Sequence, residues 1–251
     1  MNNISGVNIN KIKIIINSAS NELFEISKSF CDKLPFEIIK VDGKDGTHGH
    51  SLFQYIYKNI LDCDWIISID EDCFIIDQDE LLELLKYQID NNFAFSGMPD
   101  GGVISHRFHN PISPNPFLSI INIELLKKSL HYLKHTSQYA KDLDIFIPHN
   151  LIKLNMPYVE KFKTIIHPAY KPYGVNYDNF EEYYQTFFTM LRNGGTPLYL
   201  DAYDSTIDNL TTIIKNHKNV DIAYHTWFAR EWRTQKERIL NVVEHCKKIR
   251  K

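Results

Sequence analysis

The ten residues from Asp64 to Cys73 constrain the fold more than any other segment, and they read Asp-Trp-Ile-Ile-Ser-Ile-Asp-Glu-Asp-Cys. Residues 65–69 form a short apolar run that is typical of a strand buried in an α/β sheet. Asp70 and Asp72 follow it, one residue apart. Because ligands of open α/β sheets gather at the carboxyl ends of strands, the pair is a candidate site for a divalent cation or a phosphate. An ordinary solvated turn is the alternative interpretation of an isolated acidic pair.

Composition limits the classes of protein that this chain can belong to. The chain has 251 residues, 43% of them hydrophobic and 13% aromatic, so we expect one domain over residues 1–251 with a substantial core. The formal net charge is −3. Because proteins that bind nucleic acid concentrate positive charge on one face, no nucleic-acid partner is expected.

Cysteine usage and hydropathy indicate the compartment. The four cysteines are widely spaced and form no Cys-x-x-Cys pair, so neither a zinc ribbon nor a dense disulfide framework is predicted. No apolar run approaches the roughly 18–20 residues that span a bilayer, and residues 1–10 lack a basic segment followed by an apolar one. We therefore expect a cytoplasmic protein. The basic residues 247–251 could contact the inner face of a membrane, but a frayed, solvated end is the preferred interpretation.

Strands and helices alternate along the first hundred residues. Strands are predicted over residues 12–17, 36–41, 65–69 and 93–97, and helices from the polar residues 17–21 to about 31, from 49 to 61 and from 77 to 89. This alternation predicts an α/β fold with parallel strand pairing.

The remaining residues are less regular. Gly101, Gly102 and the prolines at positions 99, 111, 114 and 116 predict a long loop before an apolar run at 117–123. Helices are predicted over 124–133, 180–192, 210–216 and 230–249, extended segments over 197–200 and 222–224, and a turn-rich stretch over 201–208. Residues 144–158 are ambiguous between extended segments and short helices.

The acidic pair resembles the Asp-x-Asp motif of GT-A glycosyltransferases, which hold a metal ion and the diphosphate of a nucleotide-sugar. The resemblance implies a GT-A (Rossmann-like) α/β fold with a mixed, mainly parallel sheet flanked by helices. About residues 1–100 would form the nucleotide-binding half and about 101–251 the acceptor-binding half. His225 matches the late histidine ligand of many such enzymes, so the implied metal ligands are Asp70, Asp72 and His225. A nitrogen ligand favours Mn²⁺ over Mg²⁺. The alternative for His225 is a hydrogen-bonded place in a buried aromatic cluster.

The resemblance also implies contacts to the nucleotide-sugar. Asn17, Ser18 and Asp42 follow predicted strands and would lie near the base and ribose, although Asp42 precedes a glycine and fits a turn equally well. His48 lies close to a predicted helix start, where backbone N–H groups favour an anion, but it could be a plain helix-entry residue.

Further contacts are expected at the diphosphate and sugar. Asp70, Glu71 and Arg230 would contact the cofactor, since a guanidinium matches phosphate oxygens with two donors. Trp227 could stack on a sugar or base, and Asn122 is a candidate sugar contact.

Residues 177–184 resemble the segment that carries the catalytic base of inverting GT-A enzymes. Glu182 lies nearest the equivalent spacing from the glycines at 194 and 195. The family usually has Glu-Asp where this chain has Glu181-Glu182, which leaves Glu181 and Asp178 as rivals. Acids in a first helical turn can instead stabilise the helix dipole.

The resulting prediction is a metal-dependent, inverting glycosyltransferase of the kind that builds bacterial surface polysaccharide or lipooligosaccharide. Its donor would be a UDP- or GDP-sugar and its acceptor a glycan or lipid-linked glycan, with at most peripheral membrane contact. Alternatives are a sugar-nucleotide nucleotidyltransferase, an Asp-x-Asp phosphatase and a non-catalytic carbohydrate-binding relative. The phosphatase motif normally follows the first strand and continues into Thr or Val, whereas Cys73 and Phe74 follow here.

Overall fold

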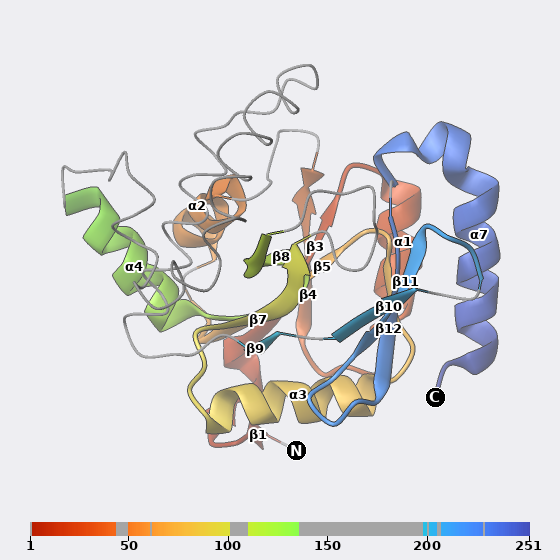
Figure 1. Ribbon diagram of the computed structural model, residues 1–251. Coiled ribbons are helices and arrows are strands. Elements are labelled where there is room, and N and C mark those ends of the chain that lie inside the picture. Colours follow the sequence, from red (N-terminus) through yellow and green to blue (C-terminus); the bar gives the residue numbers. More distant parts are fainter. Residues whose placement is uncertain are drawn as a thin grey trace.

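The computed structural model describes residues 2–43, 50–60, 62–100, 110–135, 198–199, 201–204, 207–227 and 229–251. Two sheets and five helices organise these residues (Figure 1). A short hairpin of β1 (Asn3–Ile4) and β2 (Val7–Asn8) and the 3₁₀ turn η1 (Ile9–Lys11) precede the first long strand. The predicted α/β class, with a mixed sheet flanked by helices, is confirmed.

The main sheet has six strands. In spatial order they are β4 (Glu37–Asp42), β3 (Ile12–Ser18), β5 (Trp65–Asp70), β8 (Asn110–Asn122), β7 (Phe95–Asp100) and β9 (Leu198–Tyr199). The predicted parallel pairing of β3 with β4 and β5 is confirmed, and β8 runs antiparallel to β5 and β7. In register, Asn17 pairs with Asp70 and Ser18 with Asp42. The polar residues that end three strands therefore meet at one edge of the sheet.

Helices cover both faces of this sheet. They are α1 (Asn21–Ser29), α2 (His50–Asn59), α3 (Gln78–Asp90), α4 (Ile123–His135) and α7 (Trp232–Ile249). Along β3, Ile14 and Ile16 join one core cluster with buried residues of α1, α3 and α7, whereas Ile15 between them is equally buried outside that cluster. This alternation is the two-residue period of a strand. Figure 1 shows α2 and α4 on the opposite side of the sheet from α1 and α7.

A second, antiparallel sheet packs beside the first. Its strand order is β10 (Asp201–Asp204), β11 (Thr211–Lys215), β12 (Asp221–Thr226) and β6 (Cys73–Ile75). Its buried residues, among them Phe74, Ile214 and Ala223, share the core cluster with α3 and α7. β6 follows β5 after only two residues, so the chain passes directly from the main sheet into the second one.

Two predictions fail in this second sheet, and one strand was missed. The predicted helix over 210–216 is wrong because Thr211–Lys215 is β11, and the stretch predicted as turns begins with β10. The strand β6 was not predicted at all. Residues 211–214 are all β-branched, which disfavours a helix and suits a half-buried strand.

The loop predicted over residues 101–116 is wrong in its second half, since β8 begins at residue 110. The pairing of β8 with β5 begins at Leu118, whereas the earlier residues of β8 pair with β7 across two irregularities in register. Proline has no N–H to donate to a ladder, so it is tolerated at irregular positions where no such bond is needed. The three prolines within β8 therefore do not exclude a strand.

The four cysteines, Cys31, Cys63, Cys73 and Cys246, are buried and free, as the absence of a disulfide pattern predicted. Burial raises the pKa of Cys31 and Cys246 to about 12, so neither thiol is a ready nucleophile. No helix among the described residues is long and apolar enough to cross a bilayer.

The preferred interpretation of residues 247–251 as a frayed end is wrong for the last two of them. The Lys251 N–H donates to the carbonyl of Ile76 over 2.9 Å, and Lys251 Nζ lies 2.9 Å from Asp77 Oδ2. Arg250 donates to the carbonyl of Ser29.

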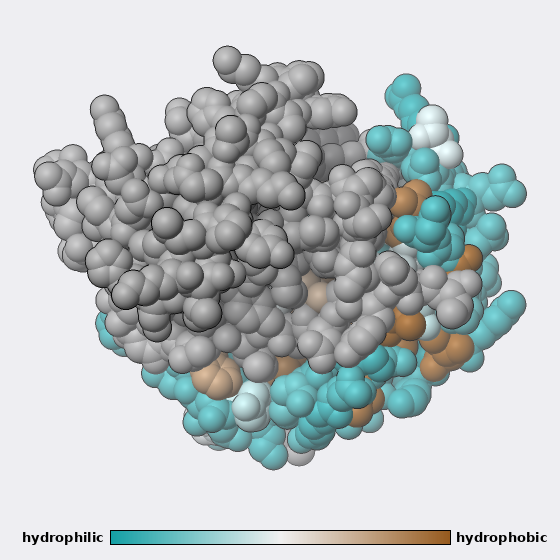
Figure 2. Space-filling view, in the orientation of Figure 1, coloured by the Kyte–Doolittle hydropathy of each residue, from teal (hydrophilic) through white to brown (hydrophobic). Residues whose placement is uncertain are grey.

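Within the described residues, Ile249 is the exposed large hydrophobic side chain, and the described surface in Figure 2 is mostly hydrophilic.

Candidate metal centre

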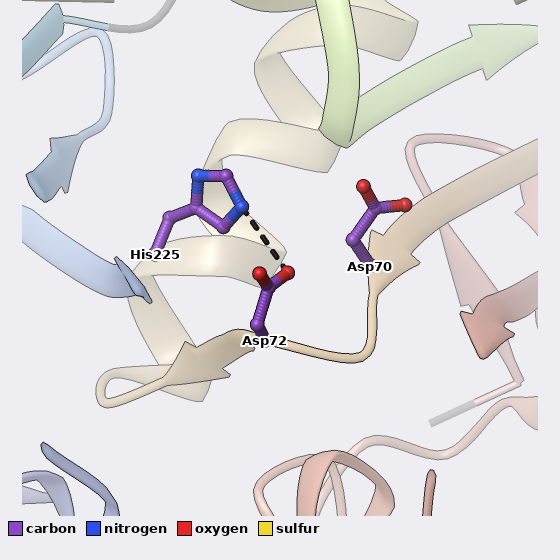
Figure 3. A group of neighbouring side chains, drawn as sticks. All are labelled: Asp70, Asp72 and His225. Carbon is purple, nitrogen blue, oxygen red and sulfur yellow. Dashed lines mark hydrogen bonds and ion pairs between the residues drawn. The ribbon is translucent and has the colours of Figure 1, made fainter. Parts of the chain in front are cut away.

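Asp70, Asp72 and His225 come together where the two sheets meet. One potential ligand atom from each side chain lies within 4.8 Å of the others (Figure 3). Asp70 ends β5 of the main sheet, Asp72 directly precedes β6, and His225 lies on β12, paired in register with Cys73. Within the part of the chain that the structure describes, this is the group of His, Cys, Asp or Glu side chains that could hold a metal ion.

Asp72 is held by several hydrogen bonds. Its Oδ1 lies 3.2 Å from His225 Nε2, its Oδ2 accepts the N–H of Ala229 over 3.2 Å, and its carbonyl accepts the N–H of Thr226 over 2.9 Å. Burial is the largest influence on the pKa of Asp72 and acts to raise it, but the charge and hydrogen bonds of His225 and Ala229 leave the pKa below its ordinary value. The carboxylate is thus ionised, as a cation ligand must be.

Aromatic rings fix the imidazole of His225. The ring of Phe117 stacks on it with centroids 3.9 Å apart and planes 10° apart, and the ring of Trp227 lies 4.3 Å away at 57°. His225 is 3% exposed, and its Nδ1 has no hydrogen-bond partner among the described residues. His225 therefore has the hydrogen bond and aromatic neighbours of the alternative interpretation, and it also faces two carboxylates.

The turn after β12 is fastened to α7 and β11. Arg238 of α7 donates from Nη1 to Thr226 Oγ1 and from Nη2 to the carbonyl of Trp227, each over 2.6 Å. Arg238 Nη1 also lies 3.3 Å from Asp208 Oδ2, and the Thr211 hydroxyl donates to the same carboxylate. The sequence analysis missed this network, since its members are scattered over 31 positions of the chain and form no motif. It also missed the contact of Phe117 with His225.

The residue between the two aspartates faces another part of the protein. Glu71 is 7% exposed, and its Oε2 lies 2.5 Å from the Ser18 hydroxyl and accepts the N–H of Ser20 over 3.1 Å. Burial raises the pKa of Glu71, although these hydrogen bonds oppose the shift. Ser18 itself is 1% exposed, so its hydroxyl serves this internal contact.

Two residues that the sequence suggested as sugar contacts serve the core instead. Trp227 is 2% exposed, packs against Phe117 with centroids 5.3 Å apart and donates its ring N–H to Thr212 Oγ1, so it offers no face for stacking. Asn122 pairs with Trp65, at the end of β5 remote from Asp70. Its Oδ1 accepts the N–H of Leu125 in the first turn of α4, which is the behaviour of a helix cap.

The other predicted site residues differ in how the structure places them. Asn17 and Asp42 lie at the same edge of the sheet as Asp70, through the register of β3, β4 and β5. Arg230 lies in η5 (Ala229–Glu231), just after the turn that contacts Asp72. His48 and the three candidate bases Asp178, Glu181 and Glu182 lie outside the described residues.

Comparisons with known proteins identify no family. No family model matches the chain, and no curated protein matches it. One similar solved structure is a glycosyltransferase involved in the glycosylation of the major capsid of PBCV-1, with 14% identity and a TM-score of 0.33 over 59% of this chain and 76% of that chain. Another is 4-diphosphocytidyl-2C-methyl-D-erythritol synthase from Anaerococcus prevotii, with 12% identity and a TM-score of 0.29 over 58% of this chain and 84% of that chain. Likeness at this level carries no argument about activity.

Proposed function

We propose that this chain is a GT-A glycosyltransferase that transfers a sugar from a nucleoside-diphosphate sugar to a hydroxyl group of a glycan or lipid-linked glycan. The observation that carries the proposal is the meeting of Asp70, Asp72 and His225 within 4.8 Å at the carboxyl end of β5. The aspartates and the histidine are more than 150 positions apart in sequence, so their convergence supports a shared role better than the acidic pair alone.

The three side chains fit a divalent cation. They offer two carboxylates and one imidazole, a donor set that suits Mn²⁺ and, less well, Mg²⁺. The hydrogen bond from the Ala229 N–H favours the ionised form of Asp72, and stacking on Phe117 holds the imidazole of His225 in place. Asp70 is more exposed than the other two.

A bound Mn²⁺ would supply Lewis-acid stabilisation of the charge that develops on the departing nucleoside diphosphate. Asp70 would orient that diphosphate at the edge of the main sheet, with Arg230 as a second contact. Asn17 and Asp42, which share this edge, would lie near the base and ribose. Glu71 and Ser18 contact each other inside the protein, and we assign neither a contact with the nucleotide.

A carboxylate from residues 178–182 would complete the reaction. We propose Glu182, with Glu181 and Asp178 as rivals, as the base that takes a proton from the acceptor hydroxyl during attack on the anomeric carbon. Inversion of configuration follows from such a single displacement. Glu182→Gln should reduce turnover without abolishing donor binding, and an unaltered rate would reassign the base.

The position of the acidic pair also bears on the phosphatase alternative. The pair follows β5, the third strand of the main sheet in chain order, whereas the Asp-x-Asp motif of those phosphatases normally follows the first. This placement favours the transferase.

Thermal unfolding of the purified protein with a panel of nucleotide-sugars, each with and without Mn²⁺, tests the proposal. Stabilisation by one UDP- or GDP-sugar that requires Mn²⁺ is expected, together with no response to sugar phosphates. Response to sugar phosphates alone would indicate a phosphatase, and response to free sugars alone would indicate a carbohydrate-binding protein.

The same strand supplies a matched pair of variants for that assay. Asp70→Asn alters the carboxyl end of β5 and should abolish the Mn²⁺-dependent stabilisation. Asp64→Asn alters an exposed aspartate next to the opposite end of β5 and should leave it intact. Equal responses from the two variants would refute the metal assignment.

A further inference from the structure

Glu71 links the acidic turn to the start of α1. Its own N–H donates to the carbonyl of Asn17 over 3.1 Å, and its carboxylate receives the N–H of Ser20 and lies 2.5 Å from the Ser18 hydroxyl. Ser20 is the N-cap of α1, where its side chain accepts the N–H of Leu23. One residue thus joins the end of β3, the first turn of α1 and the turn between β5 and β6.

The direction of these bonds separates Glu71 from its neighbours. Asp70 and Asp72 lie within reach of His225, whereas the Glu71 carboxylate is buried against Ser18 and Ser20. Both aspartates are sequence neighbours of Glu71, which these hydrogen bonds hold in place. Hydrogen bonds to His225, Ala229 and Thr226 hold Asp72 on the side of the second sheet. The bonds of Glu71 hold the middle of the turn on the side of β3 and α1, so the spacing of Asp70 and Asp72 depends on both sets of bonds.

We propose that Glu71 is a positioning residue, which sets the spacing of Asp70 and Asp72 for a divalent cation and touches neither the cation nor the nucleotide-sugar. This inference rests on the proposed function, because it concerns the same cation. Residues that orient metal ligands contribute to affinity through hydrogen bonds, and their loss typically weakens binding about 10- to 100-fold. The hydrogen bonds of Glu71 require an acceptor oxygen and no negative charge.

Two substitutions distinguish positioning from direct contact. Glu71→Gln keeps an acceptor oxygen at the same reach, so its dissociation constant for Mn²⁺ should stay within about threefold of that of the unsubstituted protein. Glu71→Ala removes the acceptor and should weaken Mn²⁺ binding about tenfold or more. Isothermal titration calorimetry with MnCl₂ measures both, after circular dichroism has established that each variant is folded.

Hydrogen exchange reports the mechanism without reference to the cation. In the absence of Mn²⁺, Glu71→Ala should speed exchange of the amides in residues 18–20 and 70–72, and Glu71→Gln should not. Glu80→Ala is the matched control. Glu80 Oε2 accepts a hydrogen bond from Asn216 Nδ2 over 2.7 Å, which connects α3 to the turn between β11 and β12. That variant should lose stability and keep its affinity for Mn²⁺.

Several results would overturn the proposal. Equal losses of affinity in Glu71→Gln and Glu71→Ala would show that the charge acts directly, and weaker binding without faster exchange would contradict positioning. Normal Mn²⁺ binding by Glu71→Ala would overturn this inference alone, whereas no Mn²⁺ binding by the unsubstituted protein would overturn the proposed function with it. If Glu71→Ala does not fold, Ser18→Ala decides: about tenfold weaker binding with faster exchange is expected, and unchanged affinity contradicts the proposal.

Discussion

The two sheets contribute to the metal centre in different ways. The main sheet supplies Asp70 from the end of β5, a strand buried along the rest of its length, and leaves this carboxylate partly exposed. The second sheet supplies His225 and the residue before β6, Asp72, both nearly buried and held by neighbouring groups. The main sheet therefore provides the core of the fold with one partly exposed ligand, and the second sheet provides two nearly buried ligands. Stability and cation affinity should respond separately to changes in the two sheets.

The largest loss of stability is expected from the main sheet. Ile14 on β3 is fully buried in the core cluster, so Ile14→Ala should lower the free energy of unfolding by about 2–5 kcal/mol, and Ile14→Val by about 0.5–1.5 kcal/mol. Urea unfolding followed by circular dichroism measures both. The Mn²⁺ affinity of the folded protein should not change. A loss of affinity in proportion to the loss of stability would show that the two do not respond separately.

A smaller loss of stability with a larger effect on the cation is expected from Arg238→Ala. The substitution removes the hydrogen bonds that hold the turn after His225, at a cost of about 1–3 kcal/mol. Because this turn also supplies the Ala229 N–H to Asp72, Mn²⁺ binding should weaken severalfold. Calorimetric titration with Mn²⁺ compares the affinity of Arg238→Ala with that of Ile14→Ala. Unchanged affinity in Arg238→Ala would mean that the turn is ordered without its arginine.

Trp227→Phe is a milder change within the same region. Phenylalanine can keep much of the packing against Phe117 and His225 but loses the N–H that donates to Thr212. The expected loss is about 0.5–1.5 kcal/mol, measured by urea unfolding, with donor binding retained. Loss of nucleotide-sugar binding without loss of stability would return Trp227 to the role of a sugar contact.

The smallest effect is expected at the end of the chain. Lys251 is 71% exposed while its partner Asp77 is 7% exposed, so Lys251→Ala should lower stability only slightly. The loss should shrink in high salt, because the ion pair is screened. Unfolding at two salt concentrations checks this. A salt-independent loss would show that the ion pair with Asp77 is not its cause.

The main sheet was largely predictable from sequence, whereas the second was predicted only at β12, where an extended segment over 222–224 was expected. β3 and β5 are rich in isoleucine, which predicts their burial, and Ser20 is one of the polar caps expected before α1. β6 has three residues and depends on pairing with β12, about 150 positions away. No local pattern encodes such a partner. The same long-range pairing places His225 beside Cys73, so the metal group could be suspected from motif order but its geometry required the fold.

The direct passage from β5 to β6 has a mechanical consequence. Since Asp70 ends a strand of the main sheet and Asp72 directly precedes a strand of the second, any sliding of one sheet over the other changes the distance between their oxygens. Cation binding and resistance to such sliding are then thermodynamically linked, so each stabilises the other by the same free energy. A bound ion would therefore stabilise the contact between the two sheets, and its loss should weaken that contact before either sheet unfolds.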